Sequence, residues 1–338
     1  MKVAILDDYQ DAVRKLNAFR VLDGLQVKIH TNNVKGLAQL SARLRDTEAL
    51  VLIRGRTAVS ASLLERLPNL KLVVQTGAVG PHVDVAACTR HNVLVCDGPS
   101  APYAAAELTW ALTMAAMRRL PQYVNHLKHG IWQNAGLRSH GTPDNFGLGT
   151  RLRGKTLGIW GYGRIGSLVA DYGRAFGMTV WVWGSQAARE RAAQAGHQTA
   201  ASPEALFTQA DVLSLHLRLS DATRGVVTPA LLASMKPTAL LVNTARAELV
   251  GDGALLGALN RGRPGMAAID VYESEPLLRG NALLQLENCV CTPHIGYVEQ
   301  ENYESFFGDA FAAVQAFAGG APIRMVNPEV WQPPGANA

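Results

Sequence analysis

A glycine-rich turn between an apolar run and a helical run constrains this chain more than any other feature. The turn, Gly161-Tyr-Gly-Arg-Ile-Gly166, directly follows the apolar segment Thr156–Trp160 and opens a helical pattern that continues to Phe176. In this context the first glycine allows a tight strand-to-helix turn, the second lets a ligand approach the backbone, and the third permits close packing of helix on sheet. Unpaired N–H groups at the start of such a helix attract anionic oxygens. The pattern therefore predicts a dinucleotide-binding turn made of Gly161, Tyr162, Gly163, Arg164, Ile165 and Gly166.

Short apolar runs alternate with helical patterns along most of the chain, which is typical of parallel sheets with crossover helices. The sequence therefore predicts an α/β protein with two doubly wound parallel-sheet domains, Rossmann-like or flavodoxin-like, with a cleft between them. Strands are expected at Val3–Leu6, Val27–His30, Ala49–Ile53, Leu70–Gln75, Val93–Val95, Thr156–Trp160, Thr179–Trp183, Val212–His216, Ala239–Asn243, Ala267–Ile269 and Val290–Cys291. Among the helices, we expect Asp11–Arg20, Lys35–Arg45, Ser60–Arg66, Ala104–Arg119 and Glu299–Phe317, followed by a tail from Pro322.

Composition excludes several classes of protein. The 338 residues are 48% apolar and 17% charged, which is ordinary for a globular chain and excludes disorder, coiled coil and collagen. Four cysteines form no Cys-x-x-Cys pair, so we expect reduced thiols in a cytoplasmic protein rather than a zinc ribbon or a disulfide scaffold. Two of them, Cys289 and Cys291, fall on a predicted strand, where we expect them to face opposite sides and to form no disulfide or metal pair. The first residues resemble a strand and not a signal peptide, so no export is expected.

The sequence favours a small anionic ligand over a membrane or a nucleic acid. The longest apolar segment, Ala101–Met117, contains Glu107 and runs into two arginines, so it is too short to span a bilayer. The net charge of +5 is scattered along the chain without a basic block, which argues against nucleic-acid binding. His126 and His129 could share a helix face, but no third ligand accompanies them, so no metal site is expected.

The strand that follows the glycine turn lacks the usual cofactor selector. In dinucleotide-binding folds this strand ends in an acidic residue that binds the adenosine ribose and repels a 2′-phosphate. Here it ends in Trp183-Gly184-Ser185, with no carboxylate. The cofactor is therefore expected to be NAD or NADP, and Ser185, Arg189 or Arg191 could contact a 2′-phosphate. The two arginines could equally be solvated charges on the following helix.

Three chemically active side chains are expected to meet beside the cofactor. Arg246, Glu275 and His294 each follow a different predicted strand, and the carboxyl ends of parallel strands line the ligand crevice. A histidinium can give a proton to the alkoxide that forms when a 2-keto acid accepts a hydride. A neighbouring Glu275 would favour the charged imidazole and orient it. The planar guanidinium of Arg246 can hold the substrate carboxylate and polarise the keto oxygen.

Four ordered motifs together carry a family resemblance. They are the glycine turn, Asn243-Thr-Ala-Arg246, Ile269-Asp270-Val271 with Glu275-Pro276, and Thr292-Pro-His294-Ile-Gly296. Over nearly its whole length the chain resembles the D-isomer-specific 2-hydroxyacid dehydrogenases, the group of phosphoglycerate dehydrogenase and the hydroxypyruvate and glyoxylate reductases. The resemblance implies that Arg246, Glu275 and His294 are catalytic, and that Asp270 contacts the nicotinamide carboxamide.

The same resemblance implies a domain arrangement and an oligomer. The substrate domain would be discontinuous, with residues 1–100 and 296–338, and the dinucleotide-binding domain would be 101–295. A homodimer is expected, with the helix Ala104–Arg119 and the irregular segment Asn125–Arg153 as its contacts.

A loop after the strand Leu70–Gln75 is the expected substrate-binding element of the first domain. Its residues Gly77, Ala78, Val79 and Gly80 offer backbone N–H groups that could bind a carboxylate. The family pattern has a second glycine where this chain has Val79, and Asn-Ile-Asp where it has His82-Val-Asp84. These departures leave the substrate acid undefined, and a plain tight turn is the alternative interpretation.

A second class of function fits the same motifs. The fold also occurs in the C-terminal-binding corepressors, in which a bound dinucleotide controls protein assembly, so a non-catalytic dinucleotide sensor is the alternative. No peptide-docking segment or disordered tail is evident in the sequence, which favours an enzyme. Incubation with NADH or NADPH and a panel of 2-keto acids would separate the two.

Overall fold

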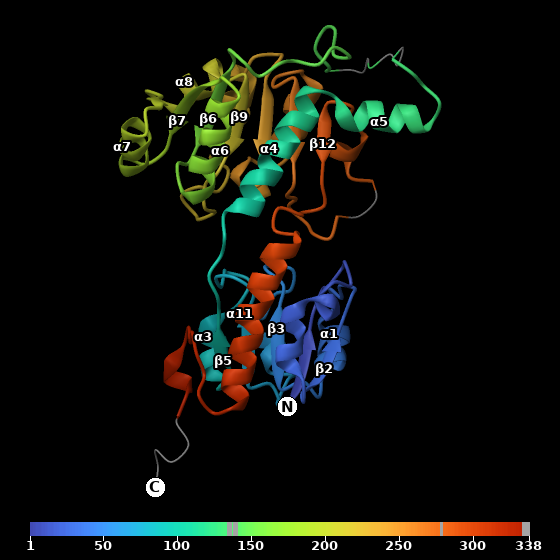
Figure 1. Cartoon of the computed structure of the whole chain (residues 1–338), viewed down its shortest axis with the longest axis vertical. Helices are drawn as coiled ribbons and strands as arrows, with labels where there is room; N and C mark the ends of the chain where they lie inside the picture. Colours follow the sequence, from blue (N-terminus) through green and yellow to red (C-terminus); the bar gives the residue numbers. More distant parts are fainter. Residues whose placement is uncertain (134–136, 138–140, 278–279, 333–338) are drawn as a thin grey trace. The chain divides into compact units, whose positions relative to one another are not determined.

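The computed structural model describes residues 1–133, 137, 141–277 and 280–332. The chain divides into two compact units, which we call unit 1 (Met1–Ala101 with Val298–Ala338) and unit 2 (Pro102–Tyr297). Each unit is built around its own parallel sheet with helices beside it (Figure 1). The expected fold class, α/β with two doubly wound parallel sheets, is confirmed.

Unit 1 has a five-stranded sheet in the order β2-β1-β3-β4-β5. This order is that of flavodoxin-like folds. Every residue of β3 and β4 is buried, which explains why these strands have uninterrupted apolar sequences. The strands are β1 Lys2–Ile5, β2 Gln26–Ile29, β3 Ala49–Leu52, β4 Leu72–Gln75 and β5 Leu94–Cys96, and the helices are α1 Leu37–Leu44, α2 Ala61–Leu64, α3 Val85–Arg90 and α11 Gln300–Ala318.

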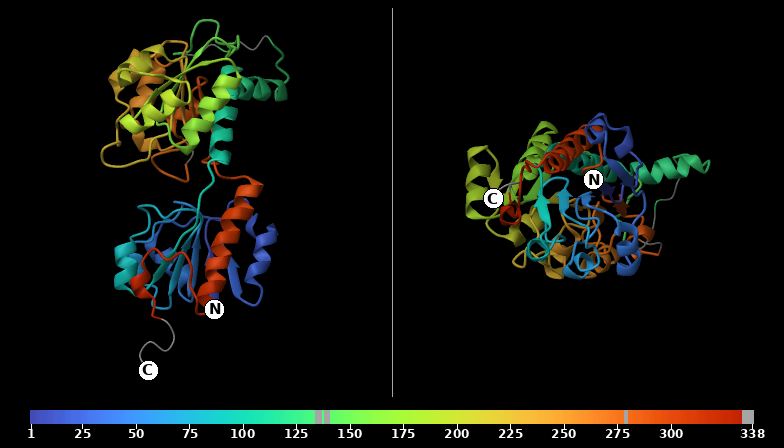
Figure 2. Two further views of the ribbon diagram at one scale, coloured as in Figure 1. Left: turned by 60° about the vertical axis from the view of Figure 1, so that its left-hand side comes forward. Right: turned by 90° about the horizontal axis from the view of Figure 1, so that it is seen from below.

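Helix α11 returns the end of the chain to unit 1. It lies alongside the strands of the unit 1 sheet and packs against β4, as Figure 2 shows on its left. Its aromatic residues Phe306, Phe307 and Phe311 are buried. Glu299 caps it by accepting hydrogen bonds from the N–H groups of Glu301 and Asn302.

The prediction of one helix over Asp11–Arg20 is wrong. Two short 3-10 helices, η1 (Val13–Lys15) and η2 (Asn17–Leu22), occupy this segment instead. The buried Asp8 carboxylate accepts hydrogen bonds from the N–H groups of Ala12 and Val13. Glu304 of α11 accepts others from the N–H groups of Asn17 and Ala18. These carboxylates accept hydrogen bonds from backbone N–H groups at the start of each short helix. The segment therefore does not form one continuous helix, although its sequence has a helical periodicity.

The segment expected as a tail from Pro322 is part of the unit 1 structure as far as residue 332. Met325 bridges Cys96 in the antiparallel sense, and the N–H of Val326 donates to the carbonyl oxygen of Val95 at 2.8 Å. The buried Asn327 accepts a hydrogen bond from the N–H of Val95 and donates to the carbonyl oxygen of Val93. The segment therefore covers the free edge of β5. Residues 333–338 of the expected tail lie outside the described residues.

Unit 2 has a seven-stranded parallel sheet in the order β12-β11-β10-β9-β6-β7-β8. From β8 inward this is the Rossmann order with one strand added at the far edge. The two-residue strand β8 is polar and exposed, so it gave no strand signal in the sequence. The strands are β6 Thr156–Trp160, β7 Thr179–Trp183, β8 Gln198–Thr199, β9 Val212–Leu215, β10 Leu240–Asn243, β11 Met266–Ile269 and β12 Cys289–Cys291.

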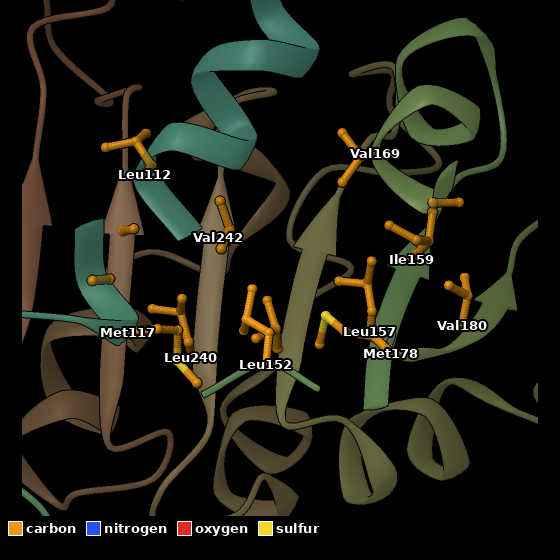
Figure 3. Packing of buried hydrophobic residues seen from close by; sticks show 14 of the residues in the cluster. Leu112, Met117, Leu152, Leu157, Ile159, Val169, Met178, Val180, Leu240 and Val242 are labelled. Carbon is orange, nitrogen blue, oxygen red and sulfur yellow. The ribbon is translucent and has the colours of Figure 1, made fainter. Parts of the chain in front are cut away.

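Helix α4 packs across one face of this sheet beside α6. Leu112 and Met117 of α4 meet Leu157 of β6 and Val242 of β10 in the same apolar cluster, which Figure 3 shows from close by. None of the helices in the described part of the chain is long and apolar enough to cross a membrane. The helices of unit 2 are α4 Tyr103–Met117, α5 Leu120–Lys128, α6 Arg164–Ala175, α7 Gln186–Gln194, α8 Pro203–Gln209, α9 Pro229–Ser234 and α10 Ala254–Asn260, with the 3-10 helices η3 Ala247–Leu249 and η4 Ala282–Gln285.

The segment Asn125–Arg153 begins inside α5, a helix that extends away from the strands of unit 2 (Figure 1). No residue of α5 is buried. Further along, Phe146 is buried beneath the Arg119 guanidinium, whose carbon lies 4.2 Å from the ring centre. Residues 134–136 and 138–140 of this segment lie outside the described residues.

The prediction that Cys289 and Cys291 face opposite sides of a strand is wrong. Their sulfur atoms lie 3.6 Å apart on β12. Side chains alternate between the two faces of a strand, so residues two apart share a face. Only neighbouring residues of a strand face opposite sides, and Cys289 and Cys291 are two positions apart. Both thiols are free.

Candidate active site

The glycine turn lies where the strand order of the unit 2 sheet reverses, between β6 and β9. In open α/β sheets this is where ligands bind. Gly161 has a φ of +102°, and a Cβ there would lie 2.7 Å from the carbonyl oxygen of His216. A Cβ at Gly166 would overlap the carbonyl oxygen of Gly161. Both positions therefore require glycine, because the loop after β9 and the start of α6 come too close for a side chain.

The start of α6 fits the pyrophosphate of a dinucleotide. An added Cβ at Gly163 would meet no described atom within 4 Å, so the space in front of the turn is open. Ser167 is the first residue of α6 whose N–H closes the helical ladder, by donating to the carbonyl oxygen of Gly163. The N–H groups of Ile165 and Gly166 therefore have no partner within the helix. Together with the helix dipole they are suited to bind an anion such as a phosphate.

Tyr162 contributes to this turn through its backbone. Its side chain is buried, with its ring 5.6 Å from that of His197 in an edge-on contact. Burial raises the pKa of the Tyr162 hydroxyl. Its carbonyl oxygen accepts a hydrogen bond from Arg191 at 3.0 Å.

The turn after β7 contains no acidic side chain. The Ser185 hydroxyl caps α7 by accepting a hydrogen bond from the N–H of Ala188. The Arg189 guanidinium stacks on the Trp183 ring at 4.5 Å. With Arg191 on the carbonyl of Tyr162, both arginines contact residues of the two turns rather than extending freely into solvent. Gly184 and Ser185 therefore bring no carboxylate to this turn, and Arg189 and Arg191 lie beside it.

His294 and Glu275 form a close pair beyond the ends of β12 and β11. The Nδ1 atom of His294 lies 2.6 Å from Oε2 of Glu275. Both side chains are about one-third exposed, at 30% and 33%. The second carboxylate oxygen of Glu275 accepts a hydrogen bond from the N–H of Tyr272. Because Nδ1 is engaged, Nε2 is the ring nitrogen left for proton transfer to a ligand.

The pKa of Glu275 lies below its usual value. Burial acts to raise it, but the hydrogen bond and charge of His294, the N–H of Tyr272 and the charge of Arg246 together outweigh burial. Glu275 therefore stays ionised throughout the neutral range. Its contribution to stability is present above the ordinary glutamate pKa and is lost as the pH falls through the lowered value.

Arg246 is held at the end of β10 by the amide side chain of Asn243. This amide donates to the carbonyl oxygen of Arg246 at 2.8 Å and accepts from the N–H of Ala245 at 3.1 Å. The Arg246 side chain is exposed, with Nη1 on the carbonyl oxygen of Ala245. The structure thus brings Arg246, Glu275 and His294 to one edge of the sheet, at which the glycine turn also lies.

Asp270 organises the turn that carries His294. Its carboxylate is fully buried and accepts hydrogen bonds from the Thr292 hydroxyl and from the N–H groups of Ile295 and Gly296, at 2.7 to 2.8 Å. Burial raises the pKa of Asp270, although these donors and the charge of His294 act to lower it. This structural role has no signal in the sequence, and the expected contact of Asp270 with the nicotinamide stays a prediction.

The chain matches a family model over more than half its length. The model, described as D-isomer specific 2-hydroxyacid dehydrogenase, NAD binding domain, matches residues 110–296. The chain belongs to the D-isomer-specific 2-hydroxyacid dehydrogenase family. It is therefore an oxidoreductase with an NAD-binding domain, and the resemblance found in the sequence motifs is confirmed.

Relatives of this dehydrogenase cover nearly the whole chain. A glyoxylate reductase from Aeropyrum pernix is 38% identical and covers 86% of each chain. A crystal structure of an oxidoreductase from Ralstonia solanacearum is 58% identical, covers 98% of both chains and has a TM-score of 0.96. A phosphoglycerate oxidoreductase from Vibrio cholerae is 51% identical, with 95% of this chain and 100% of that chain covered and a TM-score of 0.90. The chain spans 54% of the D-3-phosphoglycerate dehydrogenase from Methanocaldococcus jannaschii, to which it is 33% identical.

The loop that the sequence predicts to bind substrate follows β4 in unit 1, and its role stays a prediction. Gly77 has a φ of +72°, and a Cβ there would overlap the Arg54 guanidinium. The N–H of Val79 donates to the Asp97 carboxylate at 3.0 Å, so this amide is not available to a substrate. Among the described residues, the backbone N–H groups of Gly77, Ala78 and Gly80 donate to no other group.

Three residues of the site were not singled out by sequence reasoning. Asn243 and Tyr272 hold the catalytic candidates Arg246 and Glu275 through hydrogen bonds, and Thr292 holds Asp270. Asn243 and Thr292 lie within the quoted motifs, so their position was a usable signal. Tyr272 lies between Asp270 and Glu275, and nothing in the sequence reports that its N–H binds Glu275 and its hydroxyl binds the carbonyl of Thr292.

Proposed function

We propose that this dehydrogenase transfers a hydride between a nicotinamide and a 2-keto or D-2-hydroxy acid, with His294 as the acid–base group. The observation that carries the proposal is the contact of 2.6 Å between His294 and Glu275. A carboxylate on Nδ1 favours the charged ring and fixes its orientation, which are the properties of a proton donor near neutral pH. In reduction, Nε2 gives its proton to the oxygen of the keto group. In oxidation, it accepts the proton of the hydroxyl.

Arg246 is the proposed anchor for the substrate. Its guanidinium is exposed beside Glu275 and can donate two parallel hydrogen bonds to a carboxylate, or one to the keto oxygen. Within unit 1, the N–H groups of Gly77, Ala78 and Gly80 are by themselves the proposed backbone donors for a carboxylate. When bound, the nicotinamide cofactor supplies or accepts the hydride.

The proposed cofactor is NAD or NADP, with no selection against the 2′-phosphate. The turn after β7 offers the Ser185 hydroxyl and the stacked Arg189 guanidinium, and it has no carboxylate to repel a phosphate. A stacked guanidinium presents its N–H groups in one plane, an arrangement suited to phosphate oxygens.

The dehydrogenase is proposed to act as a homodimer. Leu120, Val124 and Leu127 form an apolar stripe along one side of α5 and are each more than half exposed. Trp132, just after this helix, is 70% exposed. A second copy of the chain would remove this apolar surface from water.

The proposed function is tested with His294→Ala. This variant should lose roughly 10²- to 10⁴-fold in kcat for 2-keto acid reduction, the usual contribution of a positioned acid. Its dissociation constants for NADH and NADPH should stay within about twofold of the wild type, because the imidazole handles the proton and not the nucleotide. His91→Ala, which removes an exposed histidine of unit 1, serves as the matched control and should keep full activity.

The assay follows reduced nicotinamide with glyoxylate, hydroxypyruvate and larger 2-keto acids as substrates. Equal losses of turnover and cofactor affinity in His294→Ala would contradict the acid–base role. If no keto acid is turned over while the nucleotide still binds, the dinucleotide-sensor alternative replaces the enzymatic one.

A further inference from the structure

Two thiols lie side by side at the edge of the unit 2 sheet. The sulfur atoms of Cys289 and Cys291 are 3.6 Å apart on β12, which lies at the end of the strand order next to β11. Cys289 is 9% exposed, and Cys291 is only half-buried. The geometry therefore places a partly exposed cysteine in contact with a buried one.

The surroundings of the two sulfur atoms make them chemically different. Hydrogen bonds from the Cys289 thiol and the Tyr272 hydroxyl lower the pKa of Cys291, although burial acts in the opposite direction. The same contact with Cys291, together with burial, raises the pKa of Cys289. Cys291 is thus the sulfur that forms a thiolate more easily, and Cys289 is its neighbouring thiol. A thiolate is the reactive form of cysteine.

The two other cysteines provide an internal contrast. Cys88 and Cys96 are fully buried in unit 1. Burial raises the pKa of Cys88 to about 11 and that of Cys96 to about 12. Buried thiols with raised pKa values are inert to oxidants. Any thiol chemistry of the native protein is therefore expected at β12.

We propose that Cys291 and Cys289 form an oxidisable dithiol, in which Cys291 reacts with a hydroperoxide and Cys289 resolves the product to a disulfide. The Cys291 thiolate attacks one peroxide oxygen, the O–O bond breaks, and the departing alkoxide or hydroxide takes a proton from water. Cys291 is then a sulfenic acid. The Cys289 sulfur attacks the Cys291 sulfur, and hydroxide leaves with the Cys289 proton as water. The dithiol loses two electrons, and the hydroperoxide is reduced to an alcohol and water.

Formation of the disulfide changes the backbone that carries His294. The S–S bond is about 2.05 Å long, so the sulfur atoms must approach by more than 1 Å from their present separation. An edge strand of three residues can pucker by this amount more easily than a central strand can. Thr292 follows Cys291 directly, and it bonds both the Asp270 carboxylate and the Tyr272 hydroxyl. Oxidation is therefore expected to displace the turn of His294 and, if the proposed function holds, to stop hydride transfer reversibly.

Intact mass and thiol mapping test the proposal independently of enzyme activity. The reduced full-length protein is treated with a small excess of hydrogen peroxide, denatured and alkylated. The expected result is a mass loss of two hydrogen atoms, with Cys289 and Cys291 protected from alkylation and Cys88 and Cys96 still alkylated. In Cys289→Ser the product should stop at a sulfenic acid that dimedone traps. Cys291→Ser should not be oxidised at all.

Activity with a 2-keto acid is measured on the same samples. The oxidised wild type should lose most of its activity and recover it with dithiothreitol, and Cys291→Ser should keep its activity in peroxide. Equal oxidation of Cys291→Ser, a disulfide that includes Cys88 or Cys96, or a persistent sulfenic acid in the wild type would overturn the dithiol. A β12 disulfide that spares activity would overturn the coupling to His294. If the protein shows no turnover at all, the mass and alkylation results still decide the thiol chemistry.

Discussion

The backbone of His294 is the most strained part of the site. Its φ of +52° lies in the left-handed region, which costs a non-glycine residue about 1–2 kcal/mol. The two N–H groups that follow it donate to the Asp270 carboxylate and offset this cost. The strained turn allows Nδ1 to reach Glu275 while the rest of the ring remains accessible. A buried acid therefore fixes the position of the exposed imidazole.

The substitution Glu275→Gln removes the negative charge of Glu275 and keeps the shape of its side chain. The amide can keep the hydrogen bonds to Tyr272 and His294, but it removes the anion that favours a protonated ring. Without this anion the imidazole is a poorer proton donor, so kcat for keto acid reduction should fall by roughly tenfold. Glu273→Gln removes the same charge from the same turn and should leave kcat unchanged. An unchanged kcat in Glu275→Gln would show that the carboxylate does not assist proton transfer.

At the scale of single residues, the sequence identified the candidate catalytic side chains more completely than the hydrogen bonds that hold them. Arg246, Glu275 and His294 come together because each follows a parallel strand, and strand ends can be read from apolar patterns. The hydrogen bonds of Tyr272 depend on the conformation of one irregular turn, which no periodic pattern encodes.

At the scale of elements, the strands other than β8 were predictable to within one or two residues, and the first helix was not. Buried parallel strands are continuous apolar runs, so the signal is local. The segment at Asp11–Arg20 has a helical pattern as well, but Asp8 and the distant Glu304 take its N–H groups. A contact between residues almost 300 positions apart leaves no mark in a short window of sequence.

The turn between β7 and α7 gives a prediction about the cofactor. Gly184→Asp would restore a carboxylate at the end of β7, where it can accept hydrogen bonds from the adenosine ribose and repel a 2′-phosphate. The ratio of the dissociation constants for NADPH and NADH should rise about tenfold, which corresponds to ~1.4 kcal/mol. Quenching of tryptophan fluorescence measures both constants without turnover.

A steric control accompanies this variant. A Cβ at Gly184 would lie 3.3 Å from the Cβ of Ala188, so any side chain presses on α7 slightly. Gly184→Ala introduces the same contact without the charge and should weaken both cofactors equally. An unchanged ratio in Gly184→Asp would place the selector elsewhere in the turn.

At the scale of the whole molecule, the two units were predictable from the sequence. Two sets of alternating strands and helices are visible there, and the predicted helix that corresponds to α4 separates them. The segment from Met325 to Asn327 was less predictable, because its pairing with β5 depends on one buried asparagine and a two-residue contact. Such short edge contacts have no periodicity. Helix α5 was not among the expected helices, because the segment from Asn125 was interpreted as irregular, although Leu120, Val124 and Leu127 have the spacing of three and four positions that is typical of one helix face.

The apolar stripe of α5 predicts that a charged side chain introduced into it weakens the proposed homodimer. Val124 is 52% exposed at the middle of the stripe, and in a dimer its side chain would be removed from water. Val124→Glu would bury an unpaired carboxylate there, which should weaken dimerisation by about 3 kcal/mol, or roughly a hundredfold in dissociation constant. Asn125→Glu adds the same charge to another side of the same helix and should leave the assembly intact. Sedimentation velocity over a range of concentrations measures both, and a Val124→Glu protein as dimeric as the wild type would exclude α5 as the contact.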